Sequence, residues 1–159
     1  MHTGIDPGLK VTAVVTLDDN GKVLYKEHFG SEYNDPFKLA PKHLPVERYR
    51  LYHDRLIRHF KENNITGTIV LEDCIGHTIG NGRKLVELKG VYLIALSYVA
   101  EPHKVFLISP TAIKKSFTGD GGASKKDMIA ECKKRGILPR HDHEADAIGM
   151  AFMSYEGNL

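Results

Sequence analysis

Cysteine is scarce in this sequence, with 2 residues among 159. Cys74 and Cys132 lie far apart and form no C-x-x-C pair, which excludes a disulfide scaffold and indicates reduced thiols. No apolar run approaches the roughly 20 residues that cross a bilayer, and the start MHTGIDPG lacks the basic and apolar regions of a signal peptide. We therefore expect a soluble, intracellular, cytoplasmic protein with no membrane partner.

Linkers and repeats are also missing. No stretch rich in Pro, Gly or Ser divides the chain, and no segment recurs. With 42% hydrophobic residues, a chain of 159 residues can form its core without disulfides. We expect a single domain over residues 1–159.

Net charge is small but unevenly distributed. The 22 Lys and Arg and the 20 Asp and Glu leave a formal charge of +2. Residues 114–140 carry eight basic and three acidic side chains, a net of +5, whereas residues 141–159 carry four acidic side chains and no Lys or Arg. This segregation predicts a basic binding surface beside an acidic cluster.

Turn residues and hydrophobic periodicity predict an α/β fold. Segments 2–6, 11–17 and 23–29 are β-type runs separated by turns, and they are expected to form antiparallel strands. An irregular loop over 30–45 then leads to an amphipathic helix that starts near Val46 and ends at Asn63-Asn64.

Strands and helices alternate in the rest of the chain. Thr68 to Leu71 and Val105 to Ile108 are buried-strand patterns, and Leu85 to Val99 between them, apolar on most sides, indicates a central buried helix. Ser124 opens a capping-box pattern, and a last helix is expected from about Asp142 to Tyr155. The order predicts a βαβ unit and a mixed sheet.

Acidic residues at strand ends are the first candidates for function. Asp6 ends the first apolar run, although Asp-Pro-Gly is most often an ordinary turn. Glu72 ends the run 69–71, where an acid needs a counter-ion or a bound cation. Asp73 competes with Glu72, because adjacent strand residues point to opposite faces and only one can share a site with Asp6.

The start of the last helix is the next candidate. His143 and Asp146 are three positions apart and share a helix face, whereas Glu144 points about 100° away. These residues are also common capping and dipole residues, so both interpretations stay open. The same helix has small side chains that would let it approach a sheet closely: Ala145, Ala147, Gly149 and Ala151.

Together, the acids and the His/Asp pair can converge on hard divalent cations, which prefer carboxylate oxygens. Paired cations of this kind clamp the attacking water and the leaving oxygen of a phosphodiester. A zinc site based on His141-x-His143 is less favoured, because no Cys or His pair elsewhere has suitable spacing.

Four motifs occur in order along nearly the whole chain: Gly4 to Gly8 followed by Val11-Thr12, Glu72 closing a strand, Ile113-Lys114 leading to the segment 119–125, and His143 to Ala147. Together they resemble the RuvC family of Holliday-junction resolvases. The resemblance implies an RNase H-like α/β fold, with a five-stranded mixed sheet of three antiparallel and then parallel strands, flanked by helices.

The resemblance also implies an activity: a homodimeric endonuclease that nicks two strands of a four-way DNA junction symmetrically, with two Mg²⁺ ions per active site and Mn²⁺ as a substitute. No nucleotide cofactor is expected. It assigns catalysis and metal binding to Asp6, Glu72, His143 and Asp146. It places Lys114 and Lys125 near the scissile phosphate, and with Lys115 and Lys126 they form two lysine pairs joined by the glycine-rich segment 119–122, which suits contact with DNA phosphates.

Two positions depart from the common family pattern. Many members have Asp where His143 stands; an imidazole binds Mg²⁺ less strongly than a carboxylate but can take a proton from the attacking water, so both roles stay open. Ile75 occupies a position where the family commonly has an aromatic residue that probes the DNA bases. The preferred cleavage sequence is therefore open.

Other functions are also compatible with these motifs. The same metal chemistry can act on flaps, forks or RNA–DNA hybrids, and a related protein can bind junctions without cutting them, since fold does not fix substrate. A D-x-G turn after a first strand also occurs in the ATPases of the actin and sugar-kinase group. Those proteins close two such domains around the nucleotide, and the length of this chain argues against that alternative.

Overall fold

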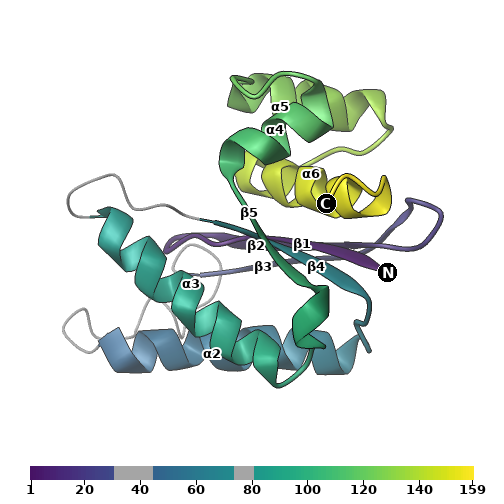
Figure 1. Cartoon of the computed structure of the whole chain (residues 1–159). Coiled ribbons are helices and arrows are strands. Elements are labelled where there is room, and N and C mark those ends of the chain that lie inside the picture. The colour runs from purple at the N-terminus through teal and green to yellow at the C-terminus, as the bar shows by residue number, and fades with distance from the viewer. Residues whose placement is uncertain (31–44, 74–80) are drawn as a thin grey trace.

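The computed structural model describes residues 1–30, 45–73 and 81–159. They form a sheet between two helical layers (Figure 1). Helices α2 (Pro45–Glu62) and α3 (Asn81–Ser97) cover one face. Helix α6 (Asp142–Tyr155) lies on the other face, and α4 (Pro110–Thr118) and α5 (Lys125–Lys134) pack on the outer side of α6. The loop expected over 30–45 lies almost entirely outside the described residues.

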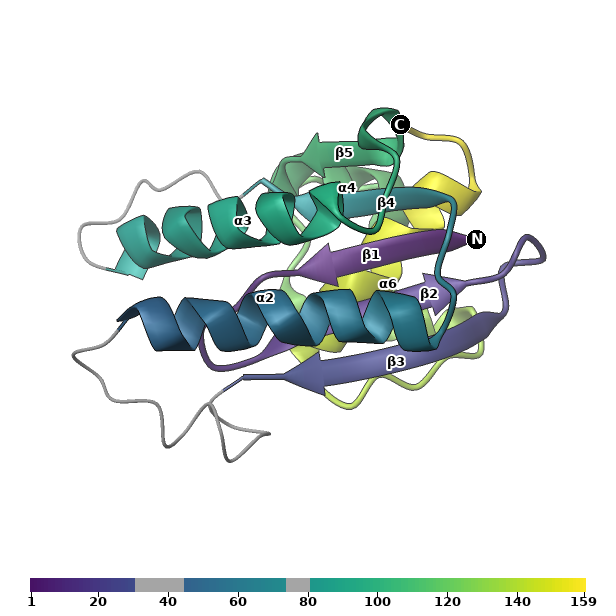
Figure 2. The same ribbon diagram turned by 90° about the horizontal axis from the view of Figure 1, so that it is seen from below.

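The sheet has five strands in the order β3-β2-β1-β4-β5. They are β1 (His2–Asp6), β2 (Thr12–Leu17), β3 (Val23–Phe29), β4 (Thr68–Glu72) and β5 (Val105–Ile108), which follows the short helix η1 (Pro102–Lys104). The pairs β1–β2 and β2–β3 are antiparallel, and β1–β4 and β4–β5 are parallel. In Figure 2 the arrows of β1 and β5 point the same way. The predicted mixed sheet is confirmed.

Both faces of the sheet are buried, and side chains alternate between them. Ile5, Val14 and Leu71 pack in the core under α2 and α3. Ala13, Val15 and Val70 pack in the core under α4, α5 and α6. Because β2 lies between two helical layers and between two neighbouring strands, all of its residues are buried.

Helix α6 lies directly on β1. A Cβ placed on Gly4 would come within 2.0 Å of the Ala147 carbonyl oxygen, so only glycine allows this contact. The small residues at 145, 147 and 151 are fully buried. The close approach expected from them is confirmed, and it holds the first turn of α6 beside the end of β1.

The helix predicted at 85–99 is confirmed as α3, but the prediction that it is central and buried is wrong. In α3, Leu88, Tyr92 and Leu96 pack against the sheet side of the molecule, but Val86 is 42% and Ile94 58% exposed. The sequence has apolar residues on the outer face as well, so the composition of this segment resembles that of a buried helix.

No helix in the described residues is long and apolar enough to cross a membrane.

Capping residues fix the connection between α4 and α5. Gly119 ends α4 in the left-handed region at φ 86°, and Ser124 begins α5 with the reciprocal hydrogen bonds of a capping box to Asp127. The capping box expected at Ser124 is confirmed.

Candidate active site

Asp6 and Glu72 end neighbouring parallel strands. Ile5 pairs with Leu71 in the register of β1 and β4, so the next residue of each strand, Asp6 and Glu72, lies at the same edge on the face covered by α6. Asp6 is only 5% exposed. Asp73 takes a different partner, since its carboxylate lies 2.5 Å from the Lys89 ammonium of α3. Of the two adjacent acids, Glu72 therefore shares the face of Asp6.

The first turn of α6 brings a histidine to Asp6. Nδ1 of His143 lies 2.6 Å from Oδ2 of Asp6. His141 is the N-cap residue of α6, and its Nδ1 accepts a hydrogen bond from the Glu144 backbone N–H at 3.2 Å. This cap, together with the contact of α6 with Gly4, places His143 over the end of β1.

A cavity of about 500 Å³ opens at this edge of the sheet. Six charged or ionisable residues line it, five from helices and strands and Lys10 from the loop after β1: Asp6, Lys10, Glu72, Lys125, His143 and Asp146. The loop after β1 completes the wall with residues 7–11. The structure thus brings together all four residues that the resemblance assigned to metal binding, and one of the four lysines.

Like charges make this site electrostatically unfavourable by itself. Burial, and then the charge of Asp6, raise the pKa of Asp146 to about 6. The hydrogen bond to Asp6 is the largest cause that raises the pKa of His143, and burial opposes it. Carboxylates that line one cavity repel one another, and a bound cation would remove this repulsion.

The donor set fits a divalent cation. Three carboxylates and one imidazole around one cavity offer mainly oxygen ligands, which suit Mg²⁺ and Mn²⁺. The raised pKa of Asp146, caused first by burial and then by the Asp6 carboxylate, means that its ionised form would gain from a bound cation. Asp6, Glu72, His143 and Asp146 are the residues of this cavity that could hold a metal by ligand type.

The lysines from the sequence motifs occupy different places. Lys125 lines the cavity and forms an ion pair with Asp142, which raises the pKa of Lys125. Lys114 on α4 is close enough for its charge to act on Asp146. Lys115 and Lys126 are exposed on α4 and α5 and do not line the described cavity.

Lys10 is a cavity residue that the sequence analysis did not single out. It follows the Asp6-Pro7-Gly8 turn by two positions, and that proximity was the available signal. Hydrogen bonds of Thr12 stabilise the turn. Thr12 Oγ1 donates to the Gly8 carbonyl at 3.0 Å and lies 2.6 Å from the Tyr92 hydroxyl of α3.

Glu144 was also missed as a buried charge. Its side chain is 0% exposed, and its oxygens lie 2.5 Å from the Lys26 ammonium and 2.9 Å from His28 Nε2. Burial would raise the pKa of Glu144, but the hydrogen bonds from His28 and Lys26 outweigh it and hold the pKa at about 2. His28 and Lys26 come from β3, and only the register of the folded sheet reveals this contact.

The histidines of the last helix do not form the zinc pair considered from sequence. His141 joins His28 and Glu144, with one possible ligand atom from each lying within 4.8 Å of the others. This set could hold a metal ion by ligand type. The Lys26 ammonium at Glu144 already supplies a positive charge there.

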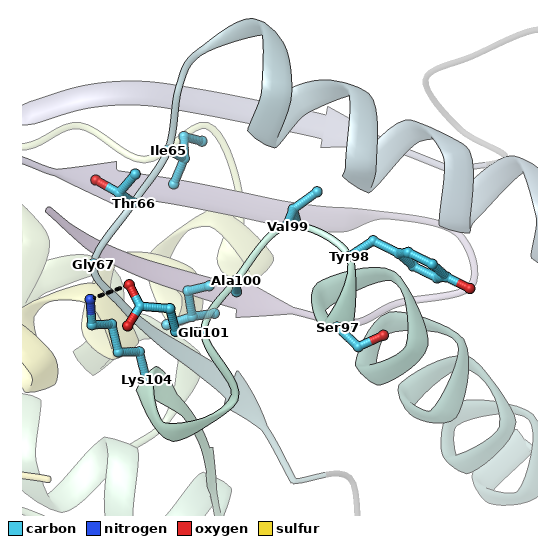
Figure 3. A pocket seen from close by; sticks show the side chains of 10 residues that line it. Ile65, Thr66, Gly67, Ser97, Tyr98, Val99, Ala100, Glu101 and Lys104 are labelled. Carbon is cyan, nitrogen blue, oxygen red and sulfur yellow. Dashed lines mark hydrogen bonds and ion pairs between the residues drawn. The ribbon is translucent and has the colours of Figure 1, made fainter.

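A second cavity of about 230 Å³ lies at the other end of the sheet (Figure 3). Gly67 on its wall sits against the backbone of Met1, at the start of β1. Figure 3 shows the side chains of Glu101 and Lys104 pointing toward one another, joined by a 2.7 Å ion pair. The described residues of this cavity contribute a single carboxylate, so it does not offer the ligands of a metal cluster.

Comparison with known proteins gives consistent relatives, although no protein-family profile matches the chain. The crossover junction endodeoxyribonuclease RuvC of Brevibacillus brevis is 28% identical over 93% of this chain and 87% of its own length. RuvC of Thermotoga maritima is 28% identical over 94% of this chain and 86% of its own length.

Solved structures agree with the sequence relatives. A Thermus thermophilus RuvC structure superposes with a TM-score of 0.72 at 21% identity and covers 98% of this chain and 94% of its own. The structure of T. thermophilus RuvC in complex with a Holliday junction substrate superposes with a TM-score of 0.69 at 24% identity. It also covers 98% of this chain and 94% of its own. The resemblance to the RuvC family, indicated by four motifs, is therefore confirmed along nearly the whole chain, and the fold is the RNase H-like fold of RuvC.

Proposed function

We propose that this chain is a metal-dependent endodeoxyribonuclease that resolves four-way DNA junctions by hydrolysing phosphodiester bonds. The observation that carries the proposal is the convergence of Asp6, Glu72, His143, Asp146 and Lys125 on one cavity. The curated relatives, named crossover junction endodeoxyribonucleases, support the same substrate class. In this proposal the first four residues are both the metal ligands and the catalytic residues.

The cation assigned to this site is Mg²⁺, with Mn²⁺ as a substitute and two ions per site. When bound, such ions neutralise charge at the phosphodiester and lower the pKa of a water molecule. The remaining roles belong to the protein. Asp6 accepts a hydrogen bond from Nδ1 of His143, and this leaves Nε2 as the nitrogen that ligates a cation or takes the proton of the attacking water.

Lysines supply the charge that the phosphate oxygens require. Lys125 at the cavity and Lys114 beside Asp146 are placed to contact the scissile phosphate. Lys115 and Lys126 are exposed on the same pair of helices and extend the basic surface along a DNA arm. Contacts of this kind position the DNA without reading its sequence.

Symmetric cleavage of two strands requires two copies of the site, and the proposed assembly is a homodimer. The outer face of α3 supports it. Val86, Gly90, Ile94 and Tyr98 recur every four residues on or just after this helix; the three side chains are 42%, 58% and 69% exposed, and a Cβ on Gly90 would meet nothing within 4 Å. An apolar stripe with a central glycine suits close packing against a second copy of α3.

The function is tested by cleavage of matched substrates. The protein is incubated with a synthetic immobile four-way junction, a fork, a flap and an RNA–DNA hybrid, each with Mg²⁺ and with EDTA. We expect paired, symmetric nicks in the junction only with Mg²⁺. Preferential cleavage of the fork, flap or hybrid would keep the metal chemistry and refute the junction as substrate, and binding without cleavage of any substrate would refute the nuclease.

A further inference from the structure

Two side chains of β3 reach the first turn of α6 from across the sheet. Asp6 pairs with Ala13, and Ala13 pairs with His28, so Asp6 and His28 lie in one cross-strand row on the face under α6. The row of Gly4, Val15 and Lys26 brings Lys26 to the same face. Small Ala13 separates Asp6 from His28, and α6 lies above this row.

Adjacent residues of α6 contact the two ends of that row. His143 Nδ1 lies 2.6 Å from Asp6, and Glu144 lies 2.9 Å from His28 and 2.5 Å from Lys26. Successive helix residues are rotated by about 100°. His143 is bound to Asp6 on β1, and Glu144 is bound to β3. These two contacts, on different sides of the helix, therefore restrict rotation of the first turn of α6 about its axis.

The helix cap belongs to the same arrangement. The ring of His141, the N-cap residue, stands edge-on to His28 with centroids 4.7 Å apart, and its Nδ1 accepts the backbone N–H of Glu144. The ring of His141 also lies 5.9 Å from that of His143. His28 thus contacts both the cap and the carboxylate of the first turn.

A buried ion pair is a costly way to hold a helix if stability alone is needed. Well-packed apolar side chains of similar volume often stabilise a fold equally well, whereas directional ion pairs specify one register. Glu144 lies within one turn of Asp146 on α6, where register matters most.

We propose that Glu144 is a positioning residue, which through Lys26 and His28 fixes the rotation of the first turn of α6 and thereby the orientation of His143 and Asp146 toward Asp6. This inference rests on the proposed nuclease function. Glu144 acts through its neighbours and contacts neither the metal nor the DNA.

Two variants test this role. Glu144→Gln removes the charge, and the triple variant Lys26→Met, His28→Leu, Glu144→Leu replaces the whole group by apolar side chains without changing the formal net charge. Glu101→Gln is the matched control, because it removes another lysine-bound carboxylate, at the far end of the sheet.

We expect the triple variant to remain folded, with a melting temperature near or above that of the wild type, and to bind the junction in EDTA with unchanged affinity. Its kcat for junction cleavage should fall about tenfold or more, because small misplacements of catalytic groups have effects of this size. The Mg²⁺ concentration for half-maximal rate should rise several-fold. Glu144→Gln should likewise lower kcat and raise the Mg²⁺ concentration for half-maximal rate while leaving junction affinity unchanged. Glu101→Gln should match the wild type in every assay.

A stable triple variant with wild-type kcat and Mg²⁺ dependence would overturn the inference and leave Glu144 as a core ion pair. Mn²⁺ binding, measured by calorimetry without DNA, separates this result from a failure of the proposed function. If the wild type cuts no junction, weaker Mn²⁺ binding by the triple variant than by the wild type still supports positioning, and equal binding refutes it.

Discussion

At the residue scale, the site concentrates negative charge that the fold alone does not neutralise. Asp146 is the clearest case, since burial and the Asp6 carboxylate raise its pKa to about 6. A carboxyl group with a higher pKa in the folded than in the unfolded chain favours folding only while it is protonated. Stability therefore falls as pH rises from 3.8 to about 6, and the loss is complete above that range.

Asp146→Asn should therefore stabilise the metal-free protein while impairing the site. At pH 8 in EDTA we expect a gain of roughly 1–3 kcal/mol, measured as a higher melting temperature. The gain should shrink as pH falls toward 4, and saturating Mg²⁺ should stabilise the wild type more than the variant. A variant that is less stable than the wild type in EDTA at pH 8 would contradict this electrostatic account.

Cys132 of α5 is buried against α6, and burial raises the pKa of its thiol to about 12. The thiolate is the reactive form, so Cys132 should resist alkylation. We expect iodoacetamide at pH 8 to leave the Cys132 peptide largely unmodified in the native protein and to modify it fully in denaturant, as read by mass spectrometry. Similar rates in both conditions would show that the thiol is accessible.

At the element scale, the contact of α6 with β1 sets the position of the site. Gly4→Ala forces a Cβ to within 2.0 Å of the Ala147 carbonyl oxygen, so helix and strand must separate. We expect a loss of about 3 kcal/mol or more in the free energy of unfolding. Gly122→Ala is the control, because its Cβ meets only the Asp120 carboxylate at 3.4 Å. A loss at Gly4 no larger than at Gly122 would refute the close contact.

Elements with strong local signals could be predicted from the sequence. The strand bounds, the capping box at Ser124 and the i, i+3 relation of His143 and Asp146 follow from periodicity and cap chemistry. The choice between Glu72 and Asp73 needed the resemblance, and the structure adds the reason: Lys89 of α3 binds Asp73. Contacts of Glu144 with β3 depend on strand register across three strands, which no local pattern contains.

At the scale of the whole molecule, the small net charge results from two opposed regions. The acidic side chains line the cavity together with Lys125, while Lys115 and Lys126 are exposed on α4 and α5. The exposed side chains of α3 lie on the other helical layer, where α2 and α3 cover the sheet (Figure 2). This arrangement leaves the proposed dimer face separate from the basic helices.

Ile94→Glu tests the proposed dimer face. Because Ile94 is 58% exposed, the charge should leave the folded chain intact and disfavour pairing of two copies. We expect sedimentation to show a dimer for the wild type and a monomer for the variant at the same concentration, with similar melting temperatures. Paired nicks in one junction should become independent single nicks. A variant that remains dimeric would place the interface elsewhere.

The central claim is that Asp6, Glu72, His143 and Asp146 form one metal-dependent catalytic site, and cleavage of a four-way junction by Asp146→Asn tests it most directly. Junction binding is measured in EDTA and cleavage in Mg²⁺ on the same preparation, beside the wild type. We predict that the variant binds the junction as tightly as the wild type and produces no nicks. An Asp146→Asn protein that cuts the junction at the wild-type rate would contradict the claim.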